Sequence, residues 1–148
     1  MESYNAFASY YDELMEDARY EERCRYILEA ARRFDHPMGR TLDLACGTGS
    51  LTLLLRQSGV DVFGADASAD MLSLAMQKCI EAGETVLFVQ QEMQALTLPE
   101  TVDTCVCTLD SINHLTDEKD VQRAFERISR YMNAGGLFIF DVNTVFSL

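Results

Sequence analysis

The feature that most constrains this chain is an apolar segment that runs directly into a glycine turn. Residues 43–50 read Asp-Leu-Ala-Cys-Gly-Thr-Gly-Ser, and an amphipathic helical pattern follows them. Glycines at 47 and 49 lack the Cβ atoms that would keep the backbone away from a ligand, and the start of the helix offers free N–H groups. The pattern predicts a strand, a turn and a helix that together bind a nucleotide-like cofactor.

Two other kinds of glycine turn fit this segment less well. A phosphate-binding P-loop needs Gly-x-x-x-x-Gly-Lys-Ser/Thr, and no lysine lies between the turn and Lys78. A dinucleotide-binding turn has the form Gly-x-Gly-x-x-Gly, but Thr52 occupies the third glycine position and would crowd the helix against the strand. The turn therefore disfavours a triphosphate site and weakens, without excluding, a pyrophosphate site.

Apolar patterns along the rest of the chain alternate between those of helices and those of strands. Strands are expected at about 40–46, 60–65, 85–90, 102–108 and 136–142. Helices are expected near 4–16, 20–34, 49–58, 68–82 and 117–133, with Ser68 as an N-cap and a last helix that ends at 133–136. This order predicts one α/β domain over 1–148, with parallel strands and a ligand site at their carboxyl ends.

Composition narrows the function classes. A chain of 148 residues with 48% hydrophobic content can bury one core, and a net charge of −12 argues against nucleic acid as a partner. No apolar run is long enough to cross a membrane, so we expect a cytoplasmic protein without a membrane partner. The five cysteines form no Cys-x-x-Cys pair, which fits reduced thiols and no metal site; Cys105 and Cys107 are expected to be buried on one strand face.

The glycine turn resembles motif I of the class I S-adenosylmethionine-dependent methyltransferases, in which an acidic residue and small or apolar positions precede Gly-x-Gly. Later segments resemble the strand ends that follow in this family: 64–68 with Met71, 91–93, 109–115 and 135–141. The resemblance covers nearly the whole chain. It implies a Rossmann-like three-layer α/β/α sandwich with a mainly parallel sheet of order 3-2-1-4-5 and added N-terminal helices.

Family members normally continue past the fifth strand into a helix and antiparallel strands 6 and 7. Because this chain stops at Leu148, the resemblance implies a core at 37–148 that is truncated after strand 5, with strands 6 and 7 absent. Residues 1–36 are expected to form a helical lid over the cofactor. The uncovered apolar sheet edge predicts self-association into a homo-oligomer.

The cofactor that the resemblance implies is S-adenosylmethionine, with S-adenosylhomocysteine as the product. Asp66, at the end of the second strand, can accept hydrogen bonds from both ribose hydroxyls, or it is an ordinary helix-capping acid. Asp43 would face the ammonium of the methionine tail, or it is a structural group bonded to loop amides. Met71 would contact the adenine or pack in the core. The remaining cofactor contacts that we expect are Tyr11, Ala45, Gly47, Thr48, Gly49, Ala67, Glu92, Met93 and Leu109.

The expected reaction is methyl transfer to an unidentified small-molecule acceptor by in-line displacement, for which a catalytic base is optional. His114, just beyond the fourth strand, is the best candidate base, with a structural histidine as the alternative. His36, next to Pro37, has little to favour it. Two other functions remain open: a non-catalytic S-adenosylmethionine-binding module, and a nicotinamide-dependent oxidoreductase, which Thr52 disfavours.

Overall fold

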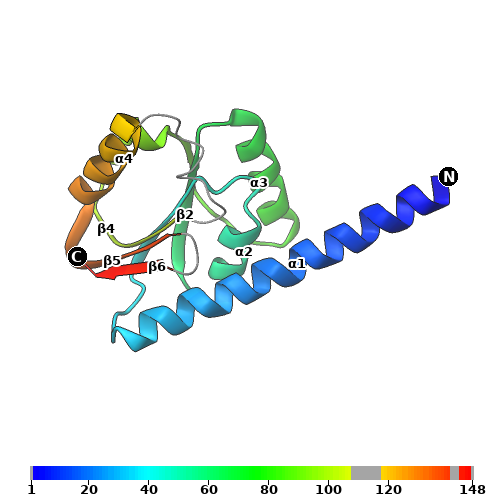
Figure 1. The fold of residues 1–148 in the computed structure, drawn as a ribbon, viewed down its shortest axis with the longest axis horizontal. Coiled ribbons are helices and arrows are strands. Elements are labelled where there is room, and N and C mark those ends of the chain that lie inside the picture. Colours follow the sequence, from blue (N-terminus) through cyan, green and yellow to red (C-terminus); the bar gives the residue numbers. More distant parts are fainter. Residues whose placement is uncertain (1, 108–117, 141–143, 148) are drawn as a thin grey trace.

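A computed structural model describes the backbone of residues 2–107, 118–140 and 144–147, and side chains over most of residues 17–140 (Figure 1). The strands are β1 (Arg40–Leu44), β2 (Asp61–Asp66), β3 (Phe88–Gln90), β4 (Val102–Cys107), β5 (Met132–Phe140) and β6 (Thr144–Ser147). The helices are α1 (Glu2–Arg33), α2 (Ser50–Gln57), α3 (Ala69–Glu81) and α4 (Glu118–Arg130), together with a 3₁₀ turn, η1 (Met93–Ala95).

The strands form one sheet of order β3-β2-β1-β4-β5-β6. The first five strands in this order are parallel, which confirms the predicted Rossmann-like order 3-2-1-4-5. The strand order reverses between β1 and β4. Ligands of open α/β sheets bind at such a reversal, beyond the carboxyl ends of the strands.

Two apolar clusters cover the two faces of the sheet. On one face, α1 and α2 pack against residues that include Val62, Val106 and Ile139. On the other face, α4 and η1 pack against residues that include Leu42 and Cys105. Figure 1 shows α4 and α1 on opposite sides of the sheet, so the three-layer arrangement expected from the sequence is present.

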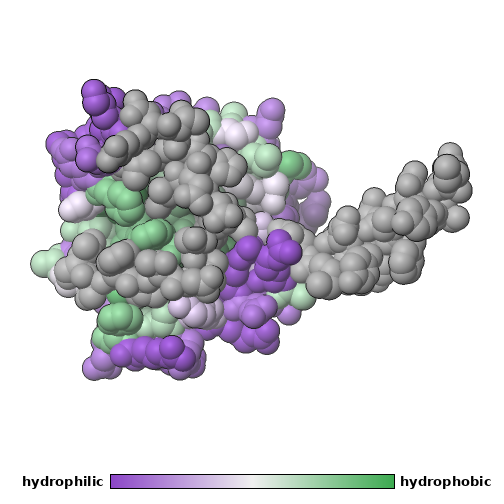
Figure 2. Space-filling view, in the orientation of Figure 1, coloured by the Kyte–Doolittle hydropathy of each residue, from purple (hydrophilic) through white to green (hydrophobic). Residues whose placement is uncertain are grey.

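Period-two alternation within each strand assigns side chains to these two clusters. In β4, Cys105 and Cys107 lie in the cluster beneath α4, whereas Val106, between them, lies in the cluster beneath α1. Both cysteines are buried, as predicted, and all five cysteines of the chain are free thiols. On the face shown in Figure 2, hydrophobic residues gather around the sheet and hydrophilic residues lie mainly toward the rim of the body.

The prediction of two N-terminal helices was wrong, because α1 is one continuous helix from Glu2 to Arg33. The segment at 17–19, where a break was expected, contains neither glycine nor proline, so nothing in the sequence stops the helix there. The second half of α1 buries Cys24 and Ile27 against the sheet. Figure 1 shows that the first half continues beyond the body of the sheet.

The boundary between α4 and β5 also differs from the prediction. Residues 133–136 were expected to end the helix, but they belong to β5, which begins at Met132. Val102 pairs with Met132 and Thr104 with Leu137, so β5 bulges between these two pairs, and Gly135 takes a positive φ of 77° there. Pairing with β4 thus decides where the strand begins.

We expected the sheet to end at β5, but it continues beyond this strand. The short strand β6 runs antiparallel to β5, with Leu137 opposite Ser147 and Phe140 opposite Thr144. It pairs with the β5 edge that the sequence analysis left uncovered. None of the described helices is long and apolar enough to cross a membrane.

Candidate functional site

The candidate site lies where the carboxyl ends of β1 and β2 meet. The loop after β1 contains three residues with positive φ, at 58° for Ala45, 57° for Gly47 and 79° for Gly49. Cys46 donates its N–H to the carbonyl of Ala65 at 2.9 Å, which holds the start of this loop against β2. The loop therefore turns tightly at the sheet edge and leads directly into α2.

Asp66, the last residue of β2, joins this loop to the next one. Its Oδ2 accepts a hydrogen bond from the Gly47 N–H at 2.8 Å, and its Oδ1 accepts one from the Ser68 N–H at 2.9 Å. The capping role that was the alternative for Asp66 is filled by Ser68, whose Oγ accepts from the Met71 N–H at 3.2 Å. Each carboxylate oxygen can accept two hydrogen bonds, so each still has one acceptor position.

The two glycines of the turn have different surroundings. A Cβ added at Gly47 would meet no atom within 4 Å, so this position faces open space. A Cβ added at Gly49 would lie 2.7 Å from the Cβ of Ala75 in α3, which is too close for real atoms. The packing of α3 against the loop therefore requires a glycine at position 49, a reason that the sequence analysis did not give.

Asp43 is buried in β1 and is bonded to α2. The Thr52 hydroxyl donates to its Oδ2 at 2.6 Å, so Thr52 binds the strand at the position where it was expected to crowd it. Burial raises the pKa of Asp43 to about 7; the Thr52 bond opposes this and the charge of Asp66 adds to it. Asp43 is only 1% exposed, so in this structure it could influence a ligand through its charge rather than through open contact.

The candidate adenine contacts divide between surface and core. The Met71 side chain is 42% exposed, which excludes the alternative that it packs in the core. Glu92 and Ala67 are exposed, whereas Met93 is buried in the cluster beneath α4, so a ligand could meet Met93 only through its backbone. Gln90, which the sequence analysis missed, donates from Nε2 to the Ala67 carbonyl at 3.1 Å and ties the end of β3 to the same edge.

Some predicted residues lie outside what the structure describes. Leu109 and His114 fall in the segment 108–117, and Tyr11 is in α1 at a position where only the backbone is described. His36 lies at the opposite edge of the sheet, where its Nε2 is 3.1 Å from both the Asp103 carbonyl and the Thr104 hydroxyl. His36 therefore has a structural position, away from the glycine loop.

Lys78 is a further residue that the sequence analysis did not place at the site. Its Nζ donates to Ser50 Oγ at 2.6 Å and to Thr48 Oγ1 at 3.3 Å. Because Lys78 is far from Thr48 and Ser50 in the sequence, only tertiary packing brings it to the glycine loop. No local pattern in the sequence could have indicated it.

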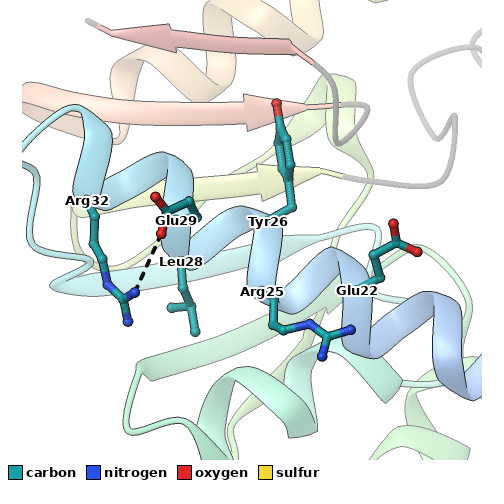
Figure 3. A pocket seen from close by; sticks show the side chains of 6 residues that line it. All are labelled: Glu22, Arg25, Tyr26, Leu28, Glu29 and Arg32. Atoms are coloured by element: carbon teal, nitrogen blue, oxygen red, sulfur yellow. Dashed lines mark ion pairs between the residues drawn. The ribbon is translucent and has the colours of Figure 1, made fainter.

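A separate hollow of about 480 Å³ lies along α1 (Figure 3). It is lined by Glu22, Arg25, Tyr26, Leu28, Glu29 and Arg32. Glu29 and Arg32 form an ion pair with 3.5 Å between Nη1 and Oε2. None of these lining residues belongs to the glycine loop or to the segments beside it.

Known proteins with the same arrangement identify the family. Residues 41–136 match a family model described as a methyltransferase domain. The putative methyltransferase YqeM of Bacillus subtilis is 38% identical over 146 residues, which are 98% of this chain and 57% of that protein.

Two solved structures are also similar. A crystal structure of an S-adenosylmethionine-dependent methyltransferase from Clostridium acetobutylicum has 34% identity and a TM-score of 0.79, over 93% of this chain and 56% of the other. The glycopeptide N-methyltransferase MtfA in complex with S-adenosylmethionine has 28% identity and a TM-score of 0.66, over 76% of this chain and 50% of the other.

The chain thus spans between 50% and 57% of the lengths of these three proteins. The matched region contains the glycine loop, Asp66, the strands β2, β3 and β4, and parts of β1 and β5. Sequence, fold and site geometry agree, and the chain belongs to the class I S-adenosylmethionine-dependent methyltransferases.

Proposed function

We propose that this protein binds S-adenosylmethionine at the edge formed by β1 and β2 and transfers its methyl group to a small-molecule acceptor. One observation carries the proposal: the Asp66 carboxylate holds the open glycine loop through Gly47 at 2.8 Å and still has free acceptor positions. A ribose with two neighbouring hydroxyls needs an acceptor of this kind. The bound cofactor would supply an electrophilic methyl group on a sulfonium.

The residues at the site fit this cofactor in shape as well as in hydrogen bonding. Open space lies in front of Gly47, where a ligand can approach the backbone. Met71 and Ala67 expose small or soft apolar surface beside Asp66, which suits one face of a flat adenine ring. We assign Glu92 and the backbone of Met93 to the adenine edge.

The methionine tail would lie along the loop formed by Ala45, Gly47, Thr48 and Gly49. Asp43 lies just behind this loop, and its negative charge would favour a ligand that carries a sulfonium and an ammonium. Binding of such a cation would in turn favour the ionised form of Asp43 and lower its pKa from about 7. We therefore assign Asp43 to stabilisation of the cationic tail through its charge.

For the transfer step, orientation and exclusion of water can supply much of the rate without a covalent intermediate. His114 remains our candidate base, and Leu109 our candidate contact beyond β4. The second half of α1 belongs to the core and is not part of a lid, so only its first half, with Tyr11, remains our candidate lid. These assignments come from the sequence.

A small-molecule acceptor is supported by the net charge of −12, which disfavours a polyanionic acceptor such as nucleic acid. The similar protein MtfA is described as a glycopeptide N-methyltransferase, which supports an acceptor other than nucleic acid. The five free thiols fit a reducing compartment, so we place the protein in the cytoplasm. Self-association would now involve the β6 edge.

Calorimetric titration with S-adenosylmethionine and S-adenosylhomocysteine tests the proposal. The unaltered chain should bind both, and Asp66→Ala should weaken binding by about 2–4 kcal/mol, or about 30- to 1,000-fold, because two charge-assisted hydrogen bonds are lost. Asp61→Ala, which removes a carboxylate from the opposite end of the same strand, is the matched control and should bind normally.

Two outcomes would contradict the proposal. An unchanged affinity in Asp66→Ala would remove this carboxylate from the site. Displacement of the bound nucleoside by a nicotinamide dinucleotide at comparable concentration would favour the oxidoreductase alternative instead.

A further inference from the structure

Lys78 is placed so that it connects α3 to the glycine loop. Its ammonium lies 2.6 Å from the hydroxyl of Ser50, the first residue of α2, and 3.3 Å from the hydroxyl of Thr48 in the loop itself. Hydrogen bonds from a charged donor are stronger than those between neutral groups. One side chain of α3 thus binds residues on both sides of Gly49.

This position is electrostatically unfavourable for α2 taken alone. The N-terminus of a helix carries a partial positive charge, and a cation beside it is repelled. The cap residue of α2, Gly49, has no side chain that could satisfy the first N–H groups, so the helix start depends on other contacts. The Thr48 and Ser50 hydroxyls accept hydrogen bonds from the Lys78 ammonium, and these bonds offset the unfavourable position of the charge.

A second contact from the same helix supports this arrangement. Ala75 lies one turn before Lys78 in α3 and is fully buried. A Cβ built at Gly49 would lie 2.7 Å from the Ala75 Cβ, which means that α3 already touches the loop there. Ala75 sets how closely α3 approaches the loop at Gly49. Lys78 holds the side chains of Thr48 and Ser50 on either side of that contact.

On the α1 side, Lys78 borders a cavity of about 260 Å³ rather than packed side chains. The other lining residues are Asp17, Tyr20, Glu21, Ser50, Leu53 and Leu54. Water can enter such a space if the ammonium is removed, so loss of this charge would leave no dry void in the core. We therefore expect the contribution of Lys78 to overall stability to be small.

We propose that Lys78 is a positioning residue for cofactor binding, which acts by holding Thr48 and Ser50 so that the backbone of the glycine loop keeps its binding geometry. The inference rests on the proposed function and adds a residue to it. Lys78 acts through the loop and is not required to touch the reacting atoms. Its removal should therefore loosen the loop and weaken binding while the fold remains.

The test is calorimetric titration with S-adenosylhomocysteine of Lys78→Met, which keeps an apolar stem of similar length and removes the ammonium. We expect about 5- to 20-fold weaker binding and a melting temperature of the ligand-free protein within about 3 °C of the original. Lys78→Arg, which restores a cationic donor, should bind within about threefold of the unaltered chain. Gln77→Ala, on the exposed side of the same turn, is the matched control and should bind normally.

A double-mutant cycle with Ser50→Ala separates action through the loop from independent effects. If Lys78 acts through Ser50, Ser50→Ala should weaken binding on its own, and the double variant should bind no worse than Lys78→Met. Additive losses would overturn the inference, as would normal binding by Lys78→Met or a loss of affinity that follows a loss of thermal stability. An unaltered chain that fails to bind would instead refute the proposed function, and the inference with it.

Discussion

The two edges of the central sheet each carry a hydrogen-bonded aspartate, and their surroundings differ. At the carboxyl edge, Asp66 accepts bonds from the backbone N–H groups of Gly47 and Ser68. At the amino edge, Asp103 accepts bonds from the Arg40 N–H at 2.9 Å and from Asn133 Nδ2 at 2.8 Å. Within the described residues, each of the two aspartates accepts two of these hydrogen bonds.

The difference lies in the glycine beside each aspartate. A Cβ added at Gly39, next to Asp103, would overlap the Asp103 side chain, whereas a Cβ added at Gly47 would meet nothing. The space beside Gly39 is thus filled by the Asp103 side chain, whereas the space beside Gly47 is open. A hydrogen-bonded carboxylate by itself does not mark a binding site; open space beside it is also needed.

A third aspartate, Asp43, is buried between the two edges. Its titration should give the largest effect on the free energy of unfolding. Its pKa rises from 3.8 to about 7 on folding, so the folded state holds a proton that the unfolded state has lost between these values. Stability should therefore fall as pH rises through this window, by on the order of 2–4 kcal/mol in total.

Denaturant unfolding of the original chain and of Asp43→Asn, measured at several pH values from 4 to 8, checks this expectation. Asparagine cannot titrate but can still accept the Thr52 bond. The difference in unfolding free energy between the two proteins should shift in favour of Asp43→Asn as pH rises. A difference that stays constant over this range would show that folding does not raise the pKa of Asp43.

Removal of the Asp103 carboxylate at the amino edge should give the next largest effect. Asp103→Ala leaves the Arg40 N–H and the Asn133 amide without their partner, so we expect a loss of about 2 kcal/mol in unfolding free energy at pH 7. Binding of S-adenosylhomocysteine should not change. Asp66→Ala should instead lose much of its affinity for S-adenosylhomocysteine and less of its stability.

The pH dependence of this loss has a defined sign. The bonds from Asn133 and from the Arg40 N–H, with the nearby His36, hold the pKa of Asp103 below its ordinary value. The stabilisation is therefore present above the ordinary carboxyl pKa and is lost as pH falls through the lowered one. The difference in unfolding free energy between the original chain and Asp103→Ala should shrink as pH falls toward 3. A difference that is equal at pH 3 and pH 7 would contradict this account.

The smallest expected effect on stability comes from a methyl group placed in the open space. Gly47→Ala and Gly135→Ala both put alanine at a positive φ with no atom within 4 Å of the new Cβ, so each should cost about 1 kcal/mol of stability. Only Gly47→Ala should also weaken S-adenosylhomocysteine binding, by about tenfold, because its methyl group faces the ligand. Equal affinities in the two variants would show that the space at Gly47 is not the binding site.

Much of the fold could be predicted because it depends on local patterns. Alternation in β4 placed Cys105 and Cys107 on one buried face, and the N-cap Ser68 marked the start of α3. The boundary of β5 was wrong because tertiary pairing overrides the local pattern there. Residues 133–136 carry a helix-ending pattern, yet pairing with β4 draws them into β5.

The candidate site shows the same division. The glycine turn and Asp66 could be proposed as a site from their residue types and spacing, and the structure brings them together. The separate roles of Gly47 and Gly49 could not, because they depend on whether α3 or open space lies beside each glycine.

The sequence by itself determined the turn between β1 and α2 and the resemblance to a known family, because both are encoded in short segments. The strand order was expected only because that family has it, and the structure confirms it. Only the tertiary structure decided that Thr52 bonds Asp43, that Lys78 reaches Ser50 and that β6 pairs with β5. The physical reason is that such contacts depend on how whole helices and strands pack. A short sequence segment does not encode which residues of other elements it will contact.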